Sequence, residues 1–422
     1  MYREKAKAQY CKVLALIIII FFSIPFAFGS KKGMDRRDKK ELKFWHSIGT
    51  YNKDILNSFI DTFNESNRQI SVKGVFQGNE EDVYLKLFSQ ENLPDIVQIP
   101  VQFLPSLKKK NYIIDMTSLI PLKIKDDIPE KIWNSVLIQD KIYGMPFSYS
   151  ADTLFVNQHI LRISGIKQEK IPESWENIVS IAEKIRHNTR DKWGIFIPME
   201  STAQFISFIQ SYTGKPVLQN GKITINTAEV KEAMTFLRQL VYLNEIMPSK
   251  ITAYEAEGLF LSGNLGIMLA QSSMLVYTES QLAYDLNVWH LPSGKSIAPI
   301  VTGTCLAILK SGIKREREAF KFIEYLVDYE NAIKWHTHTG TPAIRTSAKE
   351  SLDLLIFYEE SPNHMTSAIE LEKGEIFNPS SGFLNGSSII KKAIEEIMIN
   401  GKNPDKILDA AQIEIDKLTI GL

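Results

Sequence analysis

Between residues 42 and 99, short apolar runs alternate with stretches that have the periodicity of amphipathic helices, and this alternation limits the possible folds more than any other feature. Residues 42–45 and 69–76 have the pattern of strands, and residues 95–99 are nearly all apolar between two prolines, which is typical of a strand buried on both faces. The chain therefore opens β-α-β-α-β. This order predicts a mostly parallel sheet with right-handed crossovers.

Two amphipathic segments connect these strands. Ile55, Phe59 and Phe63 recur on one face of the first, and Asn79 is placed to cap the second, over residues 80–90. Ligands of parallel sheets bind beyond the carboxyl ends of the strands. This rule predicts that one wall of a cleft is formed by the loops at residues 45–49, 77–80 and 100–103.

The chain is expected to cross twice between two lobes. One crossing follows residues 145–147, and the other, at residues 298–309, has the pattern of a strand interrupted at 302–304. The expected fold is therefore α/β and two-lobed, with a mostly parallel sheet flanked by helices in each lobe and hinge crossings between them. The expected segments are an export signal at 1–30, a charged tether at 31–41, lobe one at 41–150 and 301–345, and lobe two at 151–300 and 346–422.

The second lobe carries three further helical signals. Ser387 is expected to cap a helix that ends at Gly401, and Asn403 with Pro404 is expected to begin the last helix. A single apolar stripe predicts one long buried helix face, formed by Val230, Met234, Leu237 and Val241.

Length and composition agree with two globular lobes. The chain has 422 residues, of which 44% are hydrophobic, so it is long enough for two cores. Lysine plus arginine and aspartate plus glutamate each number 49, so no field of one sign exists to attract nucleic acid. A nucleic-acid partner is therefore not expected.

The N-terminus has the pattern of an export leader. Basic residues precede the apolar run at 13–28, and small residues follow at 27–30, which predicts cleavage after residue 29 or 30. An uncleaved membrane anchor is the alternative. Cys11 precedes the apolar run and Cys305 alone remains after cleavage, so no intrachain disulfide is expected. We expect a soluble, monomeric protein in the periplasm.

Short motifs are spread over nearly the whole mature chain. They are Phe44-Trp45-His46-Ser47, Gln77-Gly78-Asn79, Pro94-Asp95-Ile96-Val97-Gln98, Tyr143-Gly144-Met145-Pro146-Phe147, Pro172-Glu173-Ser174-Trp175, the run 260–268, the run 300–303, Glu330-Asn331-Ala332, Trp335-His336 and Thr339-Gly340. In the order and spacing of these motifs the chain resembles the extracellular solute-binding proteins of family 1, the maltose-binding-protein-like receptors of ABC importers, and within them the glycerol-phosphate-binding branch. The resemblance implies a receptor that needs no cofactor and delivers its ligand to membrane permease subunits.

The chain departs from the glycerol-phosphate branch at three positions. Phe383 stands where that branch carries an arginine, Val101 where it carries an acid, and Thr341 where it carries an aromatic residue. These differences put glycerol phosphate itself in doubt as the ligand.

The resemblance and the strand ends together give the candidate ligand contacts. Trp45 is suited to stacking on a sugar ring, unless it is a core residue, and His46 is suited to bonding either a ligand or its own backbone. Asn79 and Glu80 open a helix at the cleft, where plain N-capping is the alternative. The other candidates are Tyr149 and Ser150 after the first crossing, Trp193, Ser272 and Ser273 in the second lobe, Gly303 and Thr304 in the return crossing, and Thr341 and Phe383.

Some residue types have no role in this prediction. His336 and His338 are two residues apart, so a helix would not place them on one face, and no metal site is expected. Trp175, Trp289 and Trp335 are expected in the cores. The common hydrolase and nucleotide-binding motifs are absent from the sequence, so a receptor rather than an enzyme is expected. A carbohydrate-active enzyme with an unrecognised carboxylate pair and a surface interaction protein remain the alternatives.

The expected cleft loops also predict the charge of the ligand. They contain no lysine or arginine, whereas a phosphate is usually fixed by such side chains. Glu80, Glu81 and Asp82 occupy the positive end of the helix at Asn79 and would repel an anion. A neutral or weakly anionic sugar or polyol is therefore expected, with Arg345 as the one nearby cation able to change this. The loops are residues 45–49, 148–152, 271–273, 302–304 and 380–387.

Overall fold

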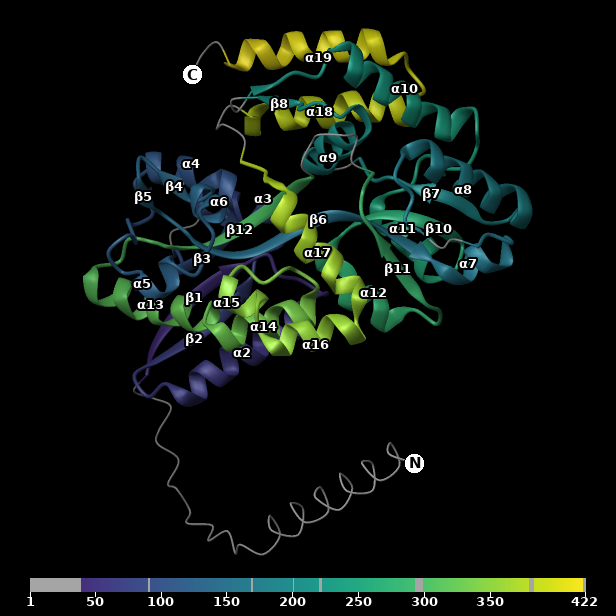
Figure 1. Cartoon of the computed structure of the whole chain (residues 1–422). Helices are drawn as coiled ribbons and strands as arrows, with labels where there is room; N and C mark the ends of the chain where they lie inside the picture. The colour runs from purple at the N-terminus through teal and green to yellow at the C-terminus, as the bar shows by residue number, and fades with distance from the viewer. Residues whose placement is uncertain are drawn as a thin grey trace, which may run out of the picture. The chain divides into compact units, whose positions relative to one another are not determined.

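The computed structural model describes residues 39–89, 92–167, 170–199, 201–219, 222–292, 299–378 and 383–419 (Figure 1). The predicted export signal lies outside these residues, as does the tether up to residue 38. The fold begins before the predicted end of the tether at residue 41, because Lys40 and Glu41 already pair with Ile70 and Ser71 in the sheet. Among the described residues, no helix is long and apolar enough to span a membrane.

The predicted β-α-β-α-β opening is confirmed. Strands β1 (Lys40–His46), β2 (Ile70–Phe76) and β3 (Ile96–Pro100) are parallel, with β1 in the middle. Helices α2 (Lys53–Ser66) and α3 (Glu80–Ser89) connect them. All five residues of β3 are buried, as its apolar run predicts for a strand covered on both faces.

Two long strands make the predicted crossings. Strand β6 (Met145–Asn157) and strand β12 (Ile300–Ile308) pair antiparallel, residues 145–151 of β6 with residues 301–306 of β12. Residues 302–304 were expected to interrupt this strand, but they continue the ladder of β12. The register shifts only between Thr304 and Cys305. Figure 1 shows β6 running from the helices around β3 to those around β10.

The remaining main strands extend the sheet from these crossings. Strand β12 pairs antiparallel with β3, while β10 (Leu265–Gln271) and β11 (Leu286–Trp289) pair antiparallel with β6. Strand β7 (Trp193–Phe196) lies parallel to β10, and β13 (Glu375–Ile376) lies parallel to β12. The pairs of the crossing strands are therefore antiparallel, apart from the short parallel pair of β12 with β13, and the other parallel pairs lie outside these strands.

Two large clusters of buried apolar side chains form separate cores. The first gathers residues from 42–151 and 301–344 together with Leu371, and the second gathers residues from 154–300 and 377–415. We call the parts of the chain around them lobe one and lobe two. A small third cluster joins Ala332 and Ala343 to Ala348 and Leu354, so the residues just past 345 pack against the end of lobe one. The exact lobe boundaries stay a prediction.

Short elements and helices complete both lobes. Those that follow β3 are η2 (Val101–Phe103), α4 (Leu104–Lys109), α5 (Leu122–Lys125), α6 (Glu130–Asn134), β4 (Leu137–Ile138) and β5 (Lys141–Ile142). Those between β6 and β12 are α7 (Gln158–Ile163), α8 (Trp175–Thr189), α9 (Thr202–Thr213), β8 (Leu218–Gln219), β9 (Lys222–Ile223), α10 (Ala228–Tyr242), α11 (Ala253–Leu261), η3 (Ser272–Met274) and α12 (Leu275–Gln281). Those after β12 are α13 (Ile313–Leu326), α14 (Tyr329–Thr339), α15 (Thr346–Lys349), α16 (Leu352–Glu360), α17 (Pro362–Lys373), α18 (Phe383–Met398) and α19 (Pro404–Thr419).

The helical predictions in lobe two are confirmed with one exception. The four stripe residues of α10 are buried, and Asn403 accepts a hydrogen bond of 2.9 Å from the amide of Asp405 at the start of α19. Trp175, Trp289 and Trp335 are buried in the cores. Ser387, however, does not cap α18, because this helix already begins at Phe383 and Ser387 lies inside it.

Candidate ligand-binding cleft

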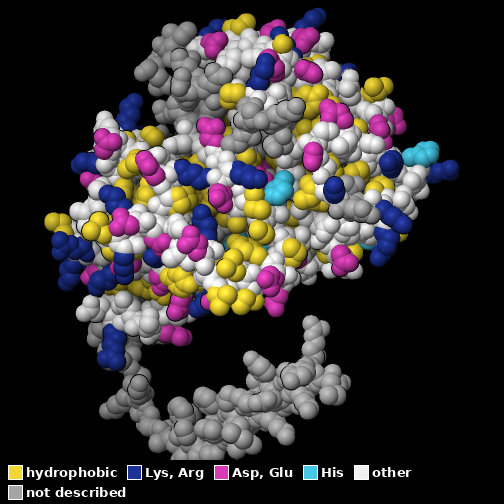
Figure 2. Space-filling model, in the orientation of Figure 1, with side chains coloured by type: hydrophobic (Ala, Val, Ile, Leu, Met, Phe, Trp, Pro, Cys, Tyr) yellow, Lys and Arg dark blue, Asp and Glu magenta, His cyan; other side chains and the backbone are white. Residues whose placement is uncertain are grey.

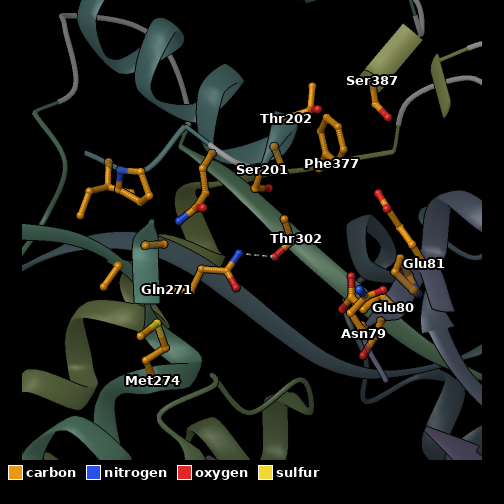
Figure 3. Close-up of a pocket in the computed structure, with 18 of the residues that line it drawn as sticks. Asn79, Glu80, Glu81, Ser201, Thr202, Gln271, Met274, Thr302, Phe377 and Ser387 are labelled. Carbon is orange, nitrogen blue, oxygen red and sulfur yellow. Dashed lines mark hydrogen bonds between the residues drawn. The ribbon is translucent and has the colours of Figure 1, made fainter. Parts of the chain in front are cut away.

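A cavity of about 520 Å³ lies between the two lobes, at the ends of their strands. Lobe one contributes the start of α3, the turn after β3 and the middle of β12. Lobe two contributes the residues after β7, the start of α9, β10 and part of α18. Figure 3 shows Asn79, Glu80 and Glu81 on one side and Ser201, Thr202, Phe377 and Ser387 on another. The lining also includes Gln102, Phe103, Phe196, Gln204, Met268, Gln271, Met274, Thr302, Gly303, Thr304 and Lys391.

The acidic wall of this cleft is the N-terminus of α3. Asn79 caps the helix as predicted, since its side-chain oxygen accepts from the amide of Asp82 at 2.8 Å, and Asp82 in turn accepts from the amide of Asn79 at 3.0 Å. Glu80 and Glu81 take no part in this cap and line the cavity. Asn79 and Asp82 therefore form the cap, while Asn79, Glu80 and Glu81 line the cavity.

Partial enclosure by the cleft raises the pKa of Glu80 to about 7, and the charge of Glu81 adds to this shift. Glu80 is nevertheless an exposed residue. We therefore expect the pKa shift of Glu80 to be largest when a ligand fills the cleft and excludes solvent.

The floor of the cleft is the middle of β12. Thr302 accepts a hydrogen bond of 3.5 Å from the side-chain amide of Gln271 and donates one of 3.2 Å to the carbonyl of Ser150. A side chain at Gly303 would overlap the ring of Tyr149. Tyr149 is fully buried and its hydroxyl lies 2.9 Å from that of Ser135. Tyr149 therefore does not line the cavity. Its ring packs against the backbone of Gly303 on the side away from the cavity.

Ser150, Ser272 and Ser273 were predicted as ligand contacts, and the structure brings them together at the hinge. The hydroxyls of Ser150 and Ser272 lie 3.2 Å apart, and the amide of Ser273 donates to Ser150 at 3.2 Å. Ser150 is 9% exposed and Ser272 2% exposed. These serines tie β6 to η3 rather than line the cavity, whereas their neighbour Gln271 does line it.

Four other predicted contacts lie away from the cavity. Trp45 packs in the core of lobe one, and burial lowers the pKa of His46 to about 4. The guanidinium carbon of Arg186 lies 4.3 Å from the ring centre of Trp193, so the two side chains stack. Thr341 is fully buried with its hydroxyl 2.7 Å from that of Thr339.

Phe383 begins α18, and its side chain lies outside the part that the structure describes. It is therefore the one predicted contact whose position relative to the cavity is open. Of the predicted set, the residues that line the cavity are Asn79, Glu80, Gly303 and Thr304.

The prediction of a cleft wall without basic side chains holds for the loops named but not for the cavity. Lys391 of α18 lines it, and its ammonium lies 3.5 Å from the carboxylate of Glu81 across the cleft. Arg345, the cation suspected from the sequence, is held instead by Asp127 at 2.6 Å and by the carbonyl of Val327. No sequence signal marks Lys391, because only the packing of α18 brings it to the cavity.

A second buried acid lies in the first crossing. Asp152 is 3% exposed, and the side-chain amide of Gln204 donates to its carboxylate at 3.5 Å. Burial raises the pKa of Asp152 to about 7, with a further contribution from the charge of Glu370. Asp152 thus belongs to β6, the first crossing strand, and not to the lining of the cavity.

A two-lobed fold with a cleft at the crossing strands matches known proteins. Residues 58–366 match the family described as bacterial extracellular solute-binding protein. The chain belongs to this family. The resemblance found in the sequence motifs is therefore confirmed, and the family is one of extracellular solute receptors.

Individual relatives agree with this assignment. The chain is 22% identical over 404 residues to the sn-glycerol-3-phosphate-binding periplasmic protein UgpB of Yersinia pseudotuberculosis, covering 87% of this chain and 90% of that one. It superposes on UgpB of Mycobacterium tuberculosis in complex with glycerophosphocholine with a TM-score of 0.82, at 18% identity, covering 90% and 98% of the two chains. Maltose-bound MalE3 of T. maritima gives a TM-score of 0.78, at 17% identity, covering 90% and 100%. These superpositions confirm the two-lobed α/β fold.

Proposed function

We propose that this protein is the substrate-binding subunit of an ABC importer, which captures a sugar or polyol in the cleft and delivers it to the permease. The observation that carries the proposal is the cavity itself, because it is lined from both lobes and its floor is a crossing strand. A ligand held there touches both walls only when the lobes are close. Binding then shifts the population toward the closed form by the difference in affinity between the two forms.

The chemistry of the lining supports a hydroxyl-rich ligand. Phe103, Phe196 and Phe377 offer apolar surface for the C–H face of a sugar or polyol, and hydroxyl and amide side chains surround them. Related proteins are named for glycerol 3-phosphate, and structural neighbours hold glycerophosphocholine or maltose. A phosphorylated polyol such as glycerol phosphate is therefore the second candidate ligand, and it is favoured by the presence of Lys391 in the lining.

A receptor is favoured over a carbohydrate-active enzyme by the position of the acids. Glu80 and Glu81 are consecutive on α3, so both come from one wall of the cleft. A glycosidase needs two carboxyl groups that flank the scissile bond. Among the described residues that line the cavity, no carboxylate comes from lobe two.

Export completes the proposal. We expect loss of about 30 residues and a monomeric mature protein that meets its permease in the periplasm. The two charge types are interspersed over the face seen in Figure 2, which agrees with a partner chosen by shape and local contacts rather than by a broad field. Intact-mass measurement of the exported protein tests cleavage. A membrane-bound product that retains its first 28 residues would contradict this part.

The main test is a thermal-shift screen over sugars, polyols and their phosphates, followed by calorimetry of each hit and chromatography of the ligand afterwards. We expect one ligand to bind with a stoichiometry near one and to be recovered unchanged. Conversion of an oligosaccharide would support the enzyme instead. Stabilisation by none of these compounds would support a surface interaction protein that only shares the fold.

A further inference from the structure

The N-terminus of α9 faces the cavity with unused hydrogen-bond donors. Ser201, Thr202, Ala203 and Gln204 all line the cavity. The first backbone bond of the helix runs from the amide of Phe205 to the carbonyl of Ser201, at 2.9 Å. The amides of the three residues before Phe205 have no acceptor within the helix. Over the described chain, no side chain bonds them either.

Among the described residues, no side chain neutralises this helix end. Ser201 has extended backbone angles, φ −96° and ψ 127°, but its side chain makes no capping hydrogen bond, and the first turn contains no acid. Other helices of the same lobe are capped, for example α10 by the hydroxyl of Thr227. At the opposite wall, Asn79 and Asp82 cap α3. Helices α3, α9 and α11 begin at the cleft, and of these three only α9 lacks a side-chain cap among the described residues, which leaves its amides open to an anion.

An independent observation at the same place is the side chain of Thr202. This residue is 6% exposed, and its hydroxyl has no hydrogen-bond partner among the described residues. A buried hydroxyl left unpaired costs free energy. Figure 3 shows Thr202 among the lining residues, on the side that carries Phe377 and Ser387. An acceptor group of a ligand at the helix end would pair this hydroxyl as well as the amides.

We propose that the N-terminus of α9 is the subsite for an anionic oxygen group of the ligand, a phosphate ester or a carboxylate. The amides of Thr202, Ala203 and Gln204 and the hydroxyl of Thr202 are the donors. The helix dipole favours the negative charge. This subsite rests on the proposed function, because it assumes that the cleft holds a solute.

The charged groups around the cleft set the strength of this subsite. Lys391 is the only cation in the described lining and attracts an anion, whereas Glu80 and Glu81 on the opposite wall repel one. Asp152 contacts Gln204 from beneath, and Glu200, next to Ser201, lies outside the described residues. The ligand expected is therefore a polyol or sugar with a single anionic group, whose hydroxyls contact the acidic wall and whose anionic end contacts α9.

The test compares three probes, glycerol, inorganic phosphate and glycerol 3-phosphate, by calorimetry up to millimolar concentration. Ser201→Asp places a carboxylate at the N-cap, where it bonds the helix amides and repels an anion. Thr202→Pro removes one amide and the hydroxyl at a position that proline tolerates, since Ser201 is extended. Thr227→Asp makes the same charge change at the N-cap of α10, outside the cavity, and is the matched control.

We expect glycerol 3-phosphate to bind more tightly than glycerol. Each α9 variant should weaken the binding of glycerol 3-phosphate about tenfold or more, because charge-assisted hydrogen bonds are lost. Ser201→Asp should keep or raise the melting temperature, and Thr227→Asp should bind like the unmodified chain. Equal binding of both glycerol compounds, unchanged affinity in the α9 variants, or no binding of either phosphate would overturn the subsite. If a neutral sugar still binds in that case, the proposed function stands and only the subsite fails.

Discussion

The phenolic hydroxyl of Tyr51 donates a hydrogen bond of 2.7 Å to the carboxylate of Glu257, and this bond joins lobe one to lobe two at the rim of the cleft. Tyr51 follows β1, and Glu257 lies on α11, one turn beyond the lining residue Ala253. Glu257 is 5% exposed. The ring of Tyr51 also lies 4.7 Å from that of Tyr277 in lobe two. Because its two partners belong to different lobes, the bond exists only while the lobes are close.

Loss of this bond should therefore weaken ligand binding without a change in ligand contacts. Tyr51→Phe keeps the ring and leaves the buried carboxylate of Glu257 without its partner, at a cost of about 1–3 kcal/mol to the closed form. We expect calorimetry to show weaker binding of any confirmed ligand. Tyr254→Phe removes a hydroxyl from an 81% exposed ring of the same helix and should change nothing. Equal affinities in both variants would mean that the bond has no part in closure.

The floor of the cleft should tolerate no side chain at Gly303. Gly303→Ala drives a methyl group into the fully buried ring of Tyr149, and overpacking of this kind costs about 1–3 kcal/mol. The control is Gly258→Ala in α11, where a methyl group meets no atom within 4 Å and should be neutral or stabilising. Chemical denaturation gives both free energies of unfolding. Equal values for the two variants would show that the floor adapts.

Asp152 should make stability depend on pH. Its pKa rises from 3.8 to about 7 on folding, so the folded chain holds a proton that the unfolded chain releases between these values. Stability from this group is full below pH 3.8 and is lost as the pH rises toward 7. Asp152→Asn should remove this slope and be more stable than the unmodified chain at pH 8. Melting temperatures of the unmodified chain and of Asp152→Asn at pH 5 and pH 8 test this prediction. If the melting temperature falls equally in both chains, other groups cause the pH dependence.

Local patterns predicted the elements well and the cleft only in part. The opening strands and helices, the cap at Asn79 and the stripe of α10 follow from periodicity and capping within a few residues of chain. Alternation fails at β1, where Leu42 and Phe44 are buried on one face and Trp45 on the other. Since helices cover both faces, the pattern cannot tell a core tryptophan from one that reaches a ligand. The loops after β1 and β3 looked alike in the sequence, yet only the second lines the cavity.

The missed residues depend on contacts between distant segments. Lys391 is an ordinary helical lysine until α18 packs beside the cavity, and Arg345 is a free cation until Asp127 binds it. The start of α9 follows strand β7 and so lies where ligands of α/β folds bind. The sequence would nevertheless predict a capped helix there, because serine is a favoured N-cap residue, and only the structure shows that Ser201 makes no capping bond.

Small-angle scattering of the exported protein, with and without a ligand confirmed by calorimetry, tests hinge closure most directly. We expect the lobes around the two cores to rotate as rigid bodies about the crossing strands, and the ligand to contact both of them. We predict a smaller radius of gyration at saturation, and a smaller change in Tyr51→Phe at the same ligand concentration. An identical scattering profile with and without saturating ligand would contradict the account.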